Sequence, residues 1–166
     1  MEPDLIDGLL ARWATLRPDL GISELGVTGR LSRLGQHMAD RDEAVFGRFG
    51  LTRGEVGMLS ALRVAGPAHR LSPTQLGRGL MLSSAGVTSR LDRLERRGLV
   101  ARQPDPSDRR GIIVELTDTG LALVDDAVAA KTQADRQLLG RLDPQDVEAL
   151  EGLLRRLLVV LEPPAS

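Results

Sequence analysis

Arginines and small hydroxyl residues are the side chains through which this sequence can bind a partner, and the partner that they suit is an anion. From Arg90 to Arg110 seven arginines stand against four acids, whereas from Glu115 to Glu162 ten acids stand against five bases. The net charge of −1 over 166 residues conceals this asymmetry. A basic segment within an acidic frame predicts one surface that attracts a polyanion such as nucleic acid.

Catalysis and metal binding have few candidate residues. The chain has no cysteine and two histidines, His37 and His69, which excludes disulfides, thiol nucleophiles and almost every kind of zinc site. It also has no G-x-S-x-G motif, no phosphate loop and no evident pair of nucleophile and base. We therefore expect no catalytic residues, no cofactor, no metal and no enzyme, and we expect ordinary surface or core roles for the two histidines.

Composition predicts a globular chain of the cytoplasm. Hydrophobic residues make up 42% of the sequence, enough for one core, but no apolar run reaches eighteen residues. The N-terminus "MEPDLIDGLL" lacks the basic and apolar regions of a secretory signal, so we expect neither export nor a membrane partner. Two Phe, one Trp and no Tyr cannot build a stacking platform, which disfavours RNA or single-stranded DNA.

A helix from Ser83 to Gly98 is the element expected to present the binding surface. Ser83 can cap it, and Val87, Leu91 and Leu94 form a narrow apolar stripe that can dock on a core. The opposite side carries small polar residues at its start and arginines toward its end. Such a helix can approach the floor of a DNA major groove closely.

The stretch "RQPDPSDRRG", Arg102 to Gly111, lies between two short runs typical of strands, "LVARQ" and "GIIVELT". These runs predict a hairpin whose loop is stiffened by prolines. Asp108 can hold one neighbouring arginine, which leaves the other, Arg109 or Arg110, free to reach DNA. Helix, turn, exposed helix and a hairpin with a cationic tip form the plan of a winged helix-turn-helix.

Helices are expected on both sides of this lobe. Sequence patterns place them at residues 4–17, at 23–49 with Ser23 as cap, and after Thr52, whose capping box is completed by Glu55. Ser72 with Pro73 begins a short helix, Thr117 begins a long one, and Asp143 with Pro144 begins the last. The terminal helices offer more apolar surface than a small lobe can cover. This favours a homodimer, with packing inside one chain as the alternative.

The segment "MLSSAGVTSRLDRLERRGLVARQPDPSDRRGIIVELTDTG", Met81 to Gly120, resembles the core signature of the MarR family of bacterial transcription regulators. The resemblance implies a mainly α fold with a small β-hairpin: a winged helix-turn-helix with a helical dimerisation region from both termini. Residues 1–50, 51–117 and 118–166 are then N-terminal helices, DNA-binding lobe and C-terminal dimerisation helices. It also implies a homodimeric repressor on a pseudo-palindromic DNA operator. The residues expected at DNA are Ser83, Ser84, Thr88, Ser89, Arg90, Arg93, Asp108, Arg109 and Arg110.

The N-terminal stretch "RWATLRPDL" resembles the extension of the urate-responsive subgroup of that family. This resemblance implies a ligand held by Trp13, Arg90 and Arg102, but the aspartate of the subgroup is replaced by Gly57. Two guanidinium groups and an indole suit a planar anion, either urate-like or an aromatic or unsaturated carboxylate. Trp13 as a core residue, Arg90 on phosphate and Arg102 paired with Asp92 or Asp105 are the alternatives.

Two other readings of the whole chain stay open at this point. A winged helix can serve as a protein-interaction module, and a DNA-binding regulator can lack a small-molecule effector.

Overall fold

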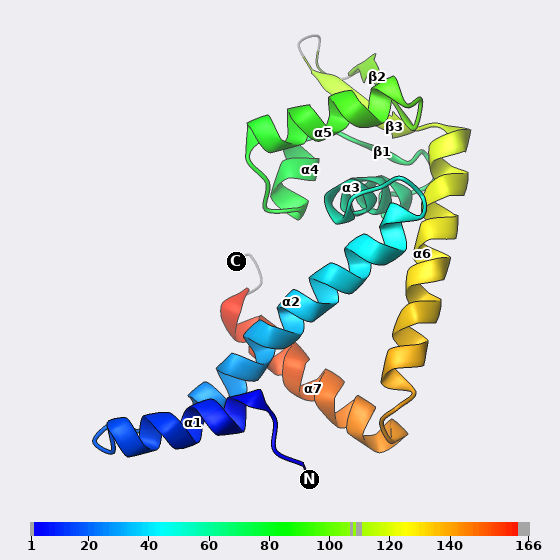
Figure 1. Cartoon of the computed structure of the whole chain (residues 1–166). Helices are drawn as coiled ribbons and strands as arrows, with labels where there is room; N and C mark the ends of the chain where they lie inside the picture. Colours follow the sequence, from blue (N-terminus) through cyan, green and yellow to red (C-terminus); the bar gives the residue numbers. More distant parts are fainter. Residues whose placement is uncertain (1, 107, 109–110, 163–166) are drawn as a thin grey trace. The chain divides into compact units, whose positions relative to one another are not determined.

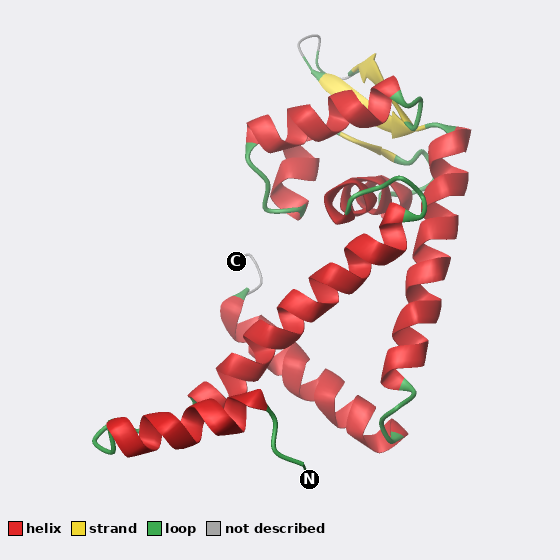
Figure 2. Cartoon of the chain, viewed as in Figure 1, coloured by secondary structure: helices red, strands yellow, loops and turns green. Residues whose placement is uncertain are grey.

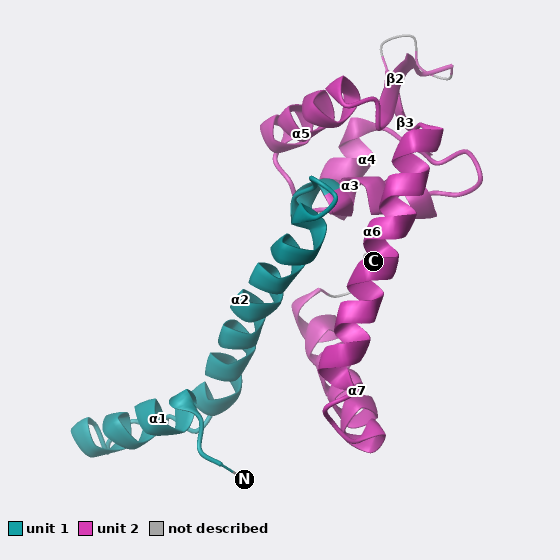
Figure 3. Ribbon diagram, turned by 45° about the vertical axis from the view of Figure 1, so that its right-hand side comes forward, with its two compact units in different colours: residues 1–55 teal, residues 56–166 magenta. Residues whose placement is uncertain are grey.

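Helices form most of the chain, and one small sheet completes it. The computed structural model describes residues 2–106, 108 and 111–162. Their elements are α1 (Leu5–Leu16), α2 (Leu25–Gly47), α3 (Arg53–Val64), β1 (Arg70–Leu71), α4 (Pro73–Gly79), α5 (Ser84–Arg96), β2 (Val100–Pro104), β3 (Ile112–Leu116), α6 (Asp118–Leu139) and α7 (Pro144–Leu161) (Figure 1). The predicted mainly α fold is confirmed (Figure 2). Residues 1–55 and 56–166 form two compact units (Figure 3).

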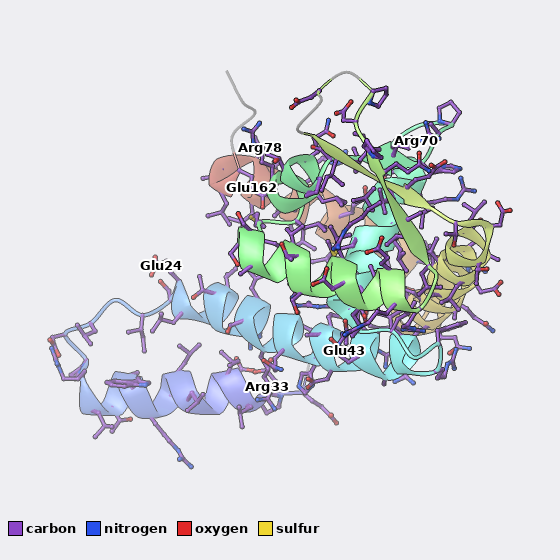
Figure 4. All side chains as sticks on the ribbon, turned by 90° about the horizontal axis from the view of Figure 1, so that it is seen from above. Glu24, Arg33, Glu43, Arg70, Arg78 and Glu162 are labelled. Carbon is purple, nitrogen blue, oxygen red and sulfur yellow. The ribbon has the colours of Figure 1, made fainter. Side chains whose placement is uncertain are left out.

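The first unit is built on the pairing of α1 with α2 (Figure 4). Asp4 caps α1 and forms a capping box with Asp7, and Arg30 of α2 forms ion pairs with both carboxylates. The side chain of Leu10 lies 3.5 Å from the point where a Cβ would stand on Gly26, and Ile6 lies 3.4 Å from that point on Gly29. Small residues on α2 therefore let the two helices approach closely.

The predicted cap of the second helix is wrong. The residue at the cap of α2 is Glu24, which has helical backbone angles and makes no capping hydrogen bond with its side chain. The hydroxyl of Ser23 instead donates to the Glu24 carboxylate at 3.0 Å. A residue that already has helical φ and ψ leaves its side chain badly placed to reach the next turn, so this helix begins without that stabilisation.

The predicted local caps elsewhere are confirmed. The Thr52 hydroxyl accepts from the backbone N–H of Glu55 at 3.3 Å, and the Glu55 carboxylate accepts from the N–H of Thr52 at 2.8 Å. Ser72, Ser83 and Thr117 cap α4, α5 and α6 in the same manner. Gln75 and Ser72 form a third capping box, which was not predicted although the spacing of the two residues is the ordinary one.

The core of the second unit collects the apolar faces of its helices and of the sheet. Val87, Leu91 and Leu94 of α5 are buried, as their spacing predicts. The other buried apolar side chains of this unit are Val56, Met58, Leu59, Leu62, Leu76, Leu99, Val100, Val114, Leu116, Val124 and Ala127. Burial of three residues on one face of α5 leaves the opposite face available for binding.

The sheet has one strand more than the predicted hairpin. Its order is β1-β3-β2, and all pairings are antiparallel. Arg102 lies opposite Val114 in the pairing of β2 with β3, which confirms the hairpin. The two residues of β1 pair with Glu115 and Val114. A strand this short has no detectable alternation, so the sequence pattern could not reveal it.

The end of the family-like segment, Leu116-Thr117-Asp118-Thr119-Gly120, has a physical role at the junction into α6. Leu116 is buried, and the Thr117 hydroxyl accepts from the N–H of Gly120 at 3.0 Å while it donates to the carbonyl of Gly98 at 2.7 Å. A Cβ on Gly120 would stand 2.0 Å from the carbonyl oxygen of Leu99. Residue 120 must therefore be glycine for α6 to lie against the start of β2.

Candidate nucleic-acid interface

The outer face of α5 presents small hydroxyl side chains to solvent. Ser83, Ser84, Thr88 and Ser89 are exposed, and Ala85 lies among them. These residues occupy the first two turns, whereas the exposed Arg93 and Arg96 lie in the last turn. Because the buried stripe fixes which way the helix faces, the structure brings together the hydroxyl residues that the sequence singled out on α5.

Hydrogen bonds within α5 restrict what two of these side chains can offer a partner. The Thr88 hydroxyl donates to the carbonyl of Ser84 at 3.0 Å, so its oxygen lone pairs and its methyl group remain for contacts outside the helix. The Arg90 guanidinium donates to the carbonyl of Gly86 at 3.1 Å and lies half-buried along the helix. Gly86 leaves room for this arrangement, because a Cβ there would stand 3.1 Å from Nη1 of Arg90 and the guanidinium would have to shift slightly.

A groove of about 310 Å³ separates α4 from α5 on this lobe. Thr74, Arg78, Ser84 and Thr88 supply its polar lining. Figure 4 labels Arg78, which the sequence analysis did not single out. It follows the cap Ser72 by six residues, and only the packing of the two helices shows that it shares a groove with Thr88.

The wing is described at its root and in part of its tip. Backbone hydrogen bonds join Asp105 N–H to the carbonyl of Gly111 at 3.0 Å and Gly111 N–H to the carbonyl of Asp108 at 2.8 Å. Asp108 is exposed. The predicted DNA contacts Arg109 and Arg110 lie outside the described residues.

Arg102, predicted as a ligand contact, is held by two carboxylates of α5. Its Nη2 donates to Oδ1 of Asp92 at 2.6 Å, and its Nη1 lies 3.1 Å from Oε2 of Glu95. Its backbone N–H donates to Oε1 of Glu95 at 3.2 Å. The alternative of a pair with Asp92 is therefore confirmed. The sequence analysis missed Glu95, although Asp92 and Glu95 stand three residues apart and so share one side of the helix.

Trp13, the third predicted ligand contact, lies on α1 in the first unit with 48% of its surface exposed. It borders a hollow of about 360 Å³ between α1 and α2, together with Ile6, Leu9, Leu10, Leu25, Thr28, Gly29 and Ser32. The alternative of a buried core tryptophan does not hold within the single chain. The indole is available for contact with another molecule.

The urate-responsive subgroup has an aspartate where this chain has Gly57, and neither Gly57 nor the nearby Glu55 offers a carboxylate to a ligand. Gly57 faces Leu80, whose Cδ2 lies 3.5 Å from the point where a Cβ would stand. Glu55 is 1% exposed, and its carboxylate accepts from both the N–H and the hydroxyl of Thr52. The surroundings of Gly57 are therefore aliphatic.

The two histidines have ordinary surroundings. His37 is exposed on α2, and Nδ1 of the half-buried His69 lies 3.0 Å from the carbonyl of Arg63. Beside His69, the Arg63 guanidinium pairs with Asp125 and lowers the pKa of that carboxyl. No group of three potential metal ligands occurs among the residues that the structure describes.

The last helix leaves its apolar residues uncovered in the single chain. No residue of α7 is buried. Its exposed apolar residues are Leu150, Leu153, Leu154, Leu157, Leu158, Val159, Val160 and Leu161. Within residues 2–106, 108 and 111–162, no helix has the length and apolarity that crossing a bilayer requires. An uncovered face of this kind is typical of a protein interface.

Comparison with known proteins agrees with this geometry. A model of the MarR family matches residues 49–111. The transcriptional regulator PecS of Dickeya dadantii is 33% identical over 151 residues, which cover 91% of each chain. A MarR family regulator of Streptomyces coelicolor, solved in complex with DNA, is 26% identical with a TM-score of 0.76 over 87% of this chain and 91% of that one.

A further solved structure concerns ligand control. BpsR of Bordetella bronchiseptica, whose DNA binding is regulated by 6-hydroxynicotinic acid, is 30% identical with a TM-score of 0.62. The match covers 77% of this chain and 98% of that one. PecS and the Streptomyces protein are transcriptional regulators, in agreement with the expectation that this chain is not an enzyme.

Proposed function

Because the chain belongs to the MarR family of DNA-binding transcriptional regulators, we propose that it is a homodimeric repressor that releases its operator when a planar anionic molecule binds. The observation that carries the DNA-binding part is the outer face of α5, where small hydroxyl residues lead to arginines above a buried apolar stripe. The proposed compartment is the cytoplasm, where a regulator meets DNA.

The proposed DNA contacts divide into two kinds. Thr88 and Ser89 lie where a helix in the major groove meets base edges; the lone pairs of Thr88 suit a base amino group and its methyl suits thymine. Ser83, Ser84, Arg90 and Arg93 flank them. At the wing, we propose that Asp108 holds one of Arg109 and Arg110 and that the other reaches the minor groove. Phosphate contacts give affinity, and base contacts give sequence preference.

Binding of duplex DNA at increasing salt tests this part. If several arginines neutralise phosphates, the logarithm of affinity falls with the logarithm of salt concentration with a slope of about −0.9 per phosphate. Replacing both Arg109 and Arg110 by alanine should weaken all duplexes alike and flatten this slope. Thr88→Ala or Ser89→Ala should change sequence preference instead. Arg136→Ala, which removes an exposed arginine of α6, is the charge control.

Undiminished binding after loss of Arg109 and Arg110 would refute the wing contact. Absence of any salt-dependent duplex binding by the wild-type chain would favour the alternative of a winged helix that binds a protein.

The proposed dimer rests on uncovered apolar surface at both ends of the chain. α1 has no buried residue, and it exposes Leu5, Leu9, Trp13 and Leu16, while α7 exposes the eight apolar residues given above. A second copy would remove this surface from water and would place two recognition helices on half-sites about one turn of DNA apart. Light scattering should give a molar mass of twice the chain mass for the wild type and of one chain mass for Leu157→Glu. A monomeric wild type would contradict the dimer.

The proposed effector must compete with the chain's own groups. An anion that takes a nitrogen of Arg102 has to displace Asp92 or Glu95, and one that takes Nη1 of Arg90 has to displace the Gly86 carbonyl. Trp13 offers a planar face in the other unit. Aromatic carboxylates such as 6-hydroxynicotinic acid, which regulates BpsR, and purines such as urate are the first probes.

A thermal-shift screen of these compounds on wild type and on Trp13→Ala tests the effector. A compound that stabilises the wild type more than the variant supports a role for Trp13, whereas equal stabilisation excludes it. A compound that binds without weakening the complex with DNA would contradict release of the operator.

A further inference from the structure

Arg102 joins α5, the proposed recognition helix, to the wing, which is the hairpin of β2 and β3. Three contacts make this link. Its guanidinium reaches both Asp92 and Glu95, and its backbone N–H reaches Glu95 as well. The guanidinium is the less exposed partner, with 26% of its side chain accessible. We call Asp92, Glu95 and Arg102 the wing clamp.

The position of β2 in the sheet explains why this strand needs a partner outside it. β2 is an end strand, because the order is β1-β3-β2. The backbone groups on its outer edge therefore find no neighbouring strand and need hydrogen bonds from another element. Glu95 supplies one of them to Arg102, so α5 acts as the missing neighbour of the strand that leads into the wing.

The pairing of β2 with β3 continues from the clamp toward the wing. Beyond Arg102, Gln103 lies opposite Ile113 and Pro104 lies opposite Ile112. The bond from Asp105 N–H to the Gly111 carbonyl closes the described part of the turn. The place where β2 is held against α5 thus decides where the wing begins.

We propose that Arg102 is a positioning residue for DNA binding, which holds the wing at a fixed distance from the recognition helix through Asp92 and Glu95. The proposal rests on the proposed function, because it requires helix and wing to meet one duplex together. A wing that is held in place before binding loses less conformational freedom on DNA than a loose wing. Arg102 can therefore raise the affinity for DNA without contacting DNA itself.

Neutralising the two acids of the clamp distinguishes a positioning role from simple electrostatics, because the two explanations predict opposite changes in DNA affinity. Asp92→Asn with Glu95→Gln removes two negative charges from a surface that is proposed to face a polyanion. Electrostatics alone predicts tighter binding. The clamp predicts weaker binding, because the wing is no longer held beside α5. The expected loss is only about fivefold, since charge-assisted hydrogen bonds between partly exposed groups contribute less than buried ones.

The experiment measures anisotropy of the labelled duplex that the wild-type chain selects from a random-sequence pool, at several salt concentrations. The double variant should bind more weakly with an unchanged salt slope, because no phosphate contact is lost. Arg102→Lys, which keeps one ion pair, should lie between wild type and double variant. Glu115→Gln on β3 is the control for loss of a carboxylate from the same sheet: Glu115 pairs with Arg70 and accepts from the Gln103 side chain, and an amide oxygen at this position can still accept that bond. It should bind as tightly as wild type or more tightly.

Hydrogen exchange over residues 100–104 provides a readout that does not depend on DNA. Exchange in β2 should rise in the double variant and stay unchanged in Glu115→Gln. If the double variant does not fold, Asp92→Asn alone replaces it: it removes the ion pair of Arg102 with Asp92 and leaves the bond from the Arg102 N–H to Glu95 in place, and DNA binding should still weaken. Equal or tighter DNA binding by the clamp variants overturns the clamp while the proposed function stands. A wild-type chain without salt-dependent duplex binding overturns both.

Discussion

Replacing Gly120 by alanine perturbs the contact between the first turn of α6 and the start of β2. A Cβ at residue 120 would stand 2.0 Å from the carbonyl oxygen and 2.9 Å from the carbonyl carbon of Leu99. Both atoms belong to the backbone, so no side chain can rotate away to make room. The Leu99 oxygen also accepts from the N–H of Thr117 at 3.2 Å, which ties the same two segments together.

The size of the effect follows from the displacement that alanine requires. Contacts of a Cβ closer than 3.0 Å are essentially never seen, so α6 has to withdraw by about 1 Å, which stretches the Thr117 hydrogen bond beyond its useful range. Overpacking costs about 1–3 kcal/mol, and a buried carbonyl left without its donor costs a similar amount. Alanine returns about 1 kcal/mol through its better helix propensity. The free energy of unfolding should therefore fall by about 3 kcal/mol.

Thermal unfolding followed by circular dichroism checks this value. For a chain of this length the midpoint should fall by about 6–12 °C. Gly79→Ala, at the end of α4 in the same unit, is the control, because nothing lies within 4 Å of its Cβ position. The control should unfold at the wild-type temperature or slightly above it. A midpoint for Gly120→Ala within about 2 °C of wild type would refute the close approach of α6 to Leu99.

Other changes test the caps, the core and the pairing of α1 with α2. Thr117→Ala removes both the cap of α6 and the bond to the Gly98 carbonyl, and chemical denaturation should show a loss of about 1–2 kcal/mol. Leu91→Ala, at a side chain that is 1% exposed, should cost about 2–5 kcal/mol, whereas the exposed Thr88→Ala on the same helix should cost less than about 0.5 kcal/mol; equal losses would mean that the helix faces the other way. The backbone N–H of Asp4 and the Arg30 guanidinium lower the pKa of Asp7, so its stabilising effect is present above the unfolded pKa of about 3.9 and is lost as the pH falls through the lower folded value. The fluorescence of Trp13, the chain's only tryptophan, should change over that acid range in wild type and not in Asp7→Asn; the same change in both would exclude Asp7.

Short-range hydrogen bonds account for most of what could be predicted from sequence. Thr52 with Glu55, Ser72 with Pro73, Ser83 and Thr117 all cap helices where their spacing indicates. A cap joins a side chain to backbone only two or three residues away, so it forms whatever the rest of the chain does. Ser23 fails because the residue after it already has helical angles, and residue type does not reveal where the first helical angle falls.

The face of α5 was also predictable, because one helical wheel decides it. Val87, Leu91 and Leu94 are buried, and this leaves Ser84, Thr88 and Ser89 outside. The signature from Met81 to Gly120 indicated the family correctly for the same reason, since its apolar stripe, hairpin and cap are all local patterns.

Contacts between segments far apart in the chain decided the features that the sequence left open. Asp92 and Asp105 were both open as partners for Arg102 from sequence, and the packing of α5 against the outer edge of β2 selected Asp92 and added Glu95. The two-residue strand β1 exists only because β3 lies beside it. The reason that residue 120 must be glycine is a carbonyl 21 residues earlier in the chain, and no local pattern reveals that contact. The start of most helices and the apolar face of α5 could thus be read from neighbours along the chain, because a cap or a helical face involves residues only a few positions apart. The charge pairs and the glycine that cannot change depend on segments that meet only after folding, so they emerged from the three-dimensional structure alone.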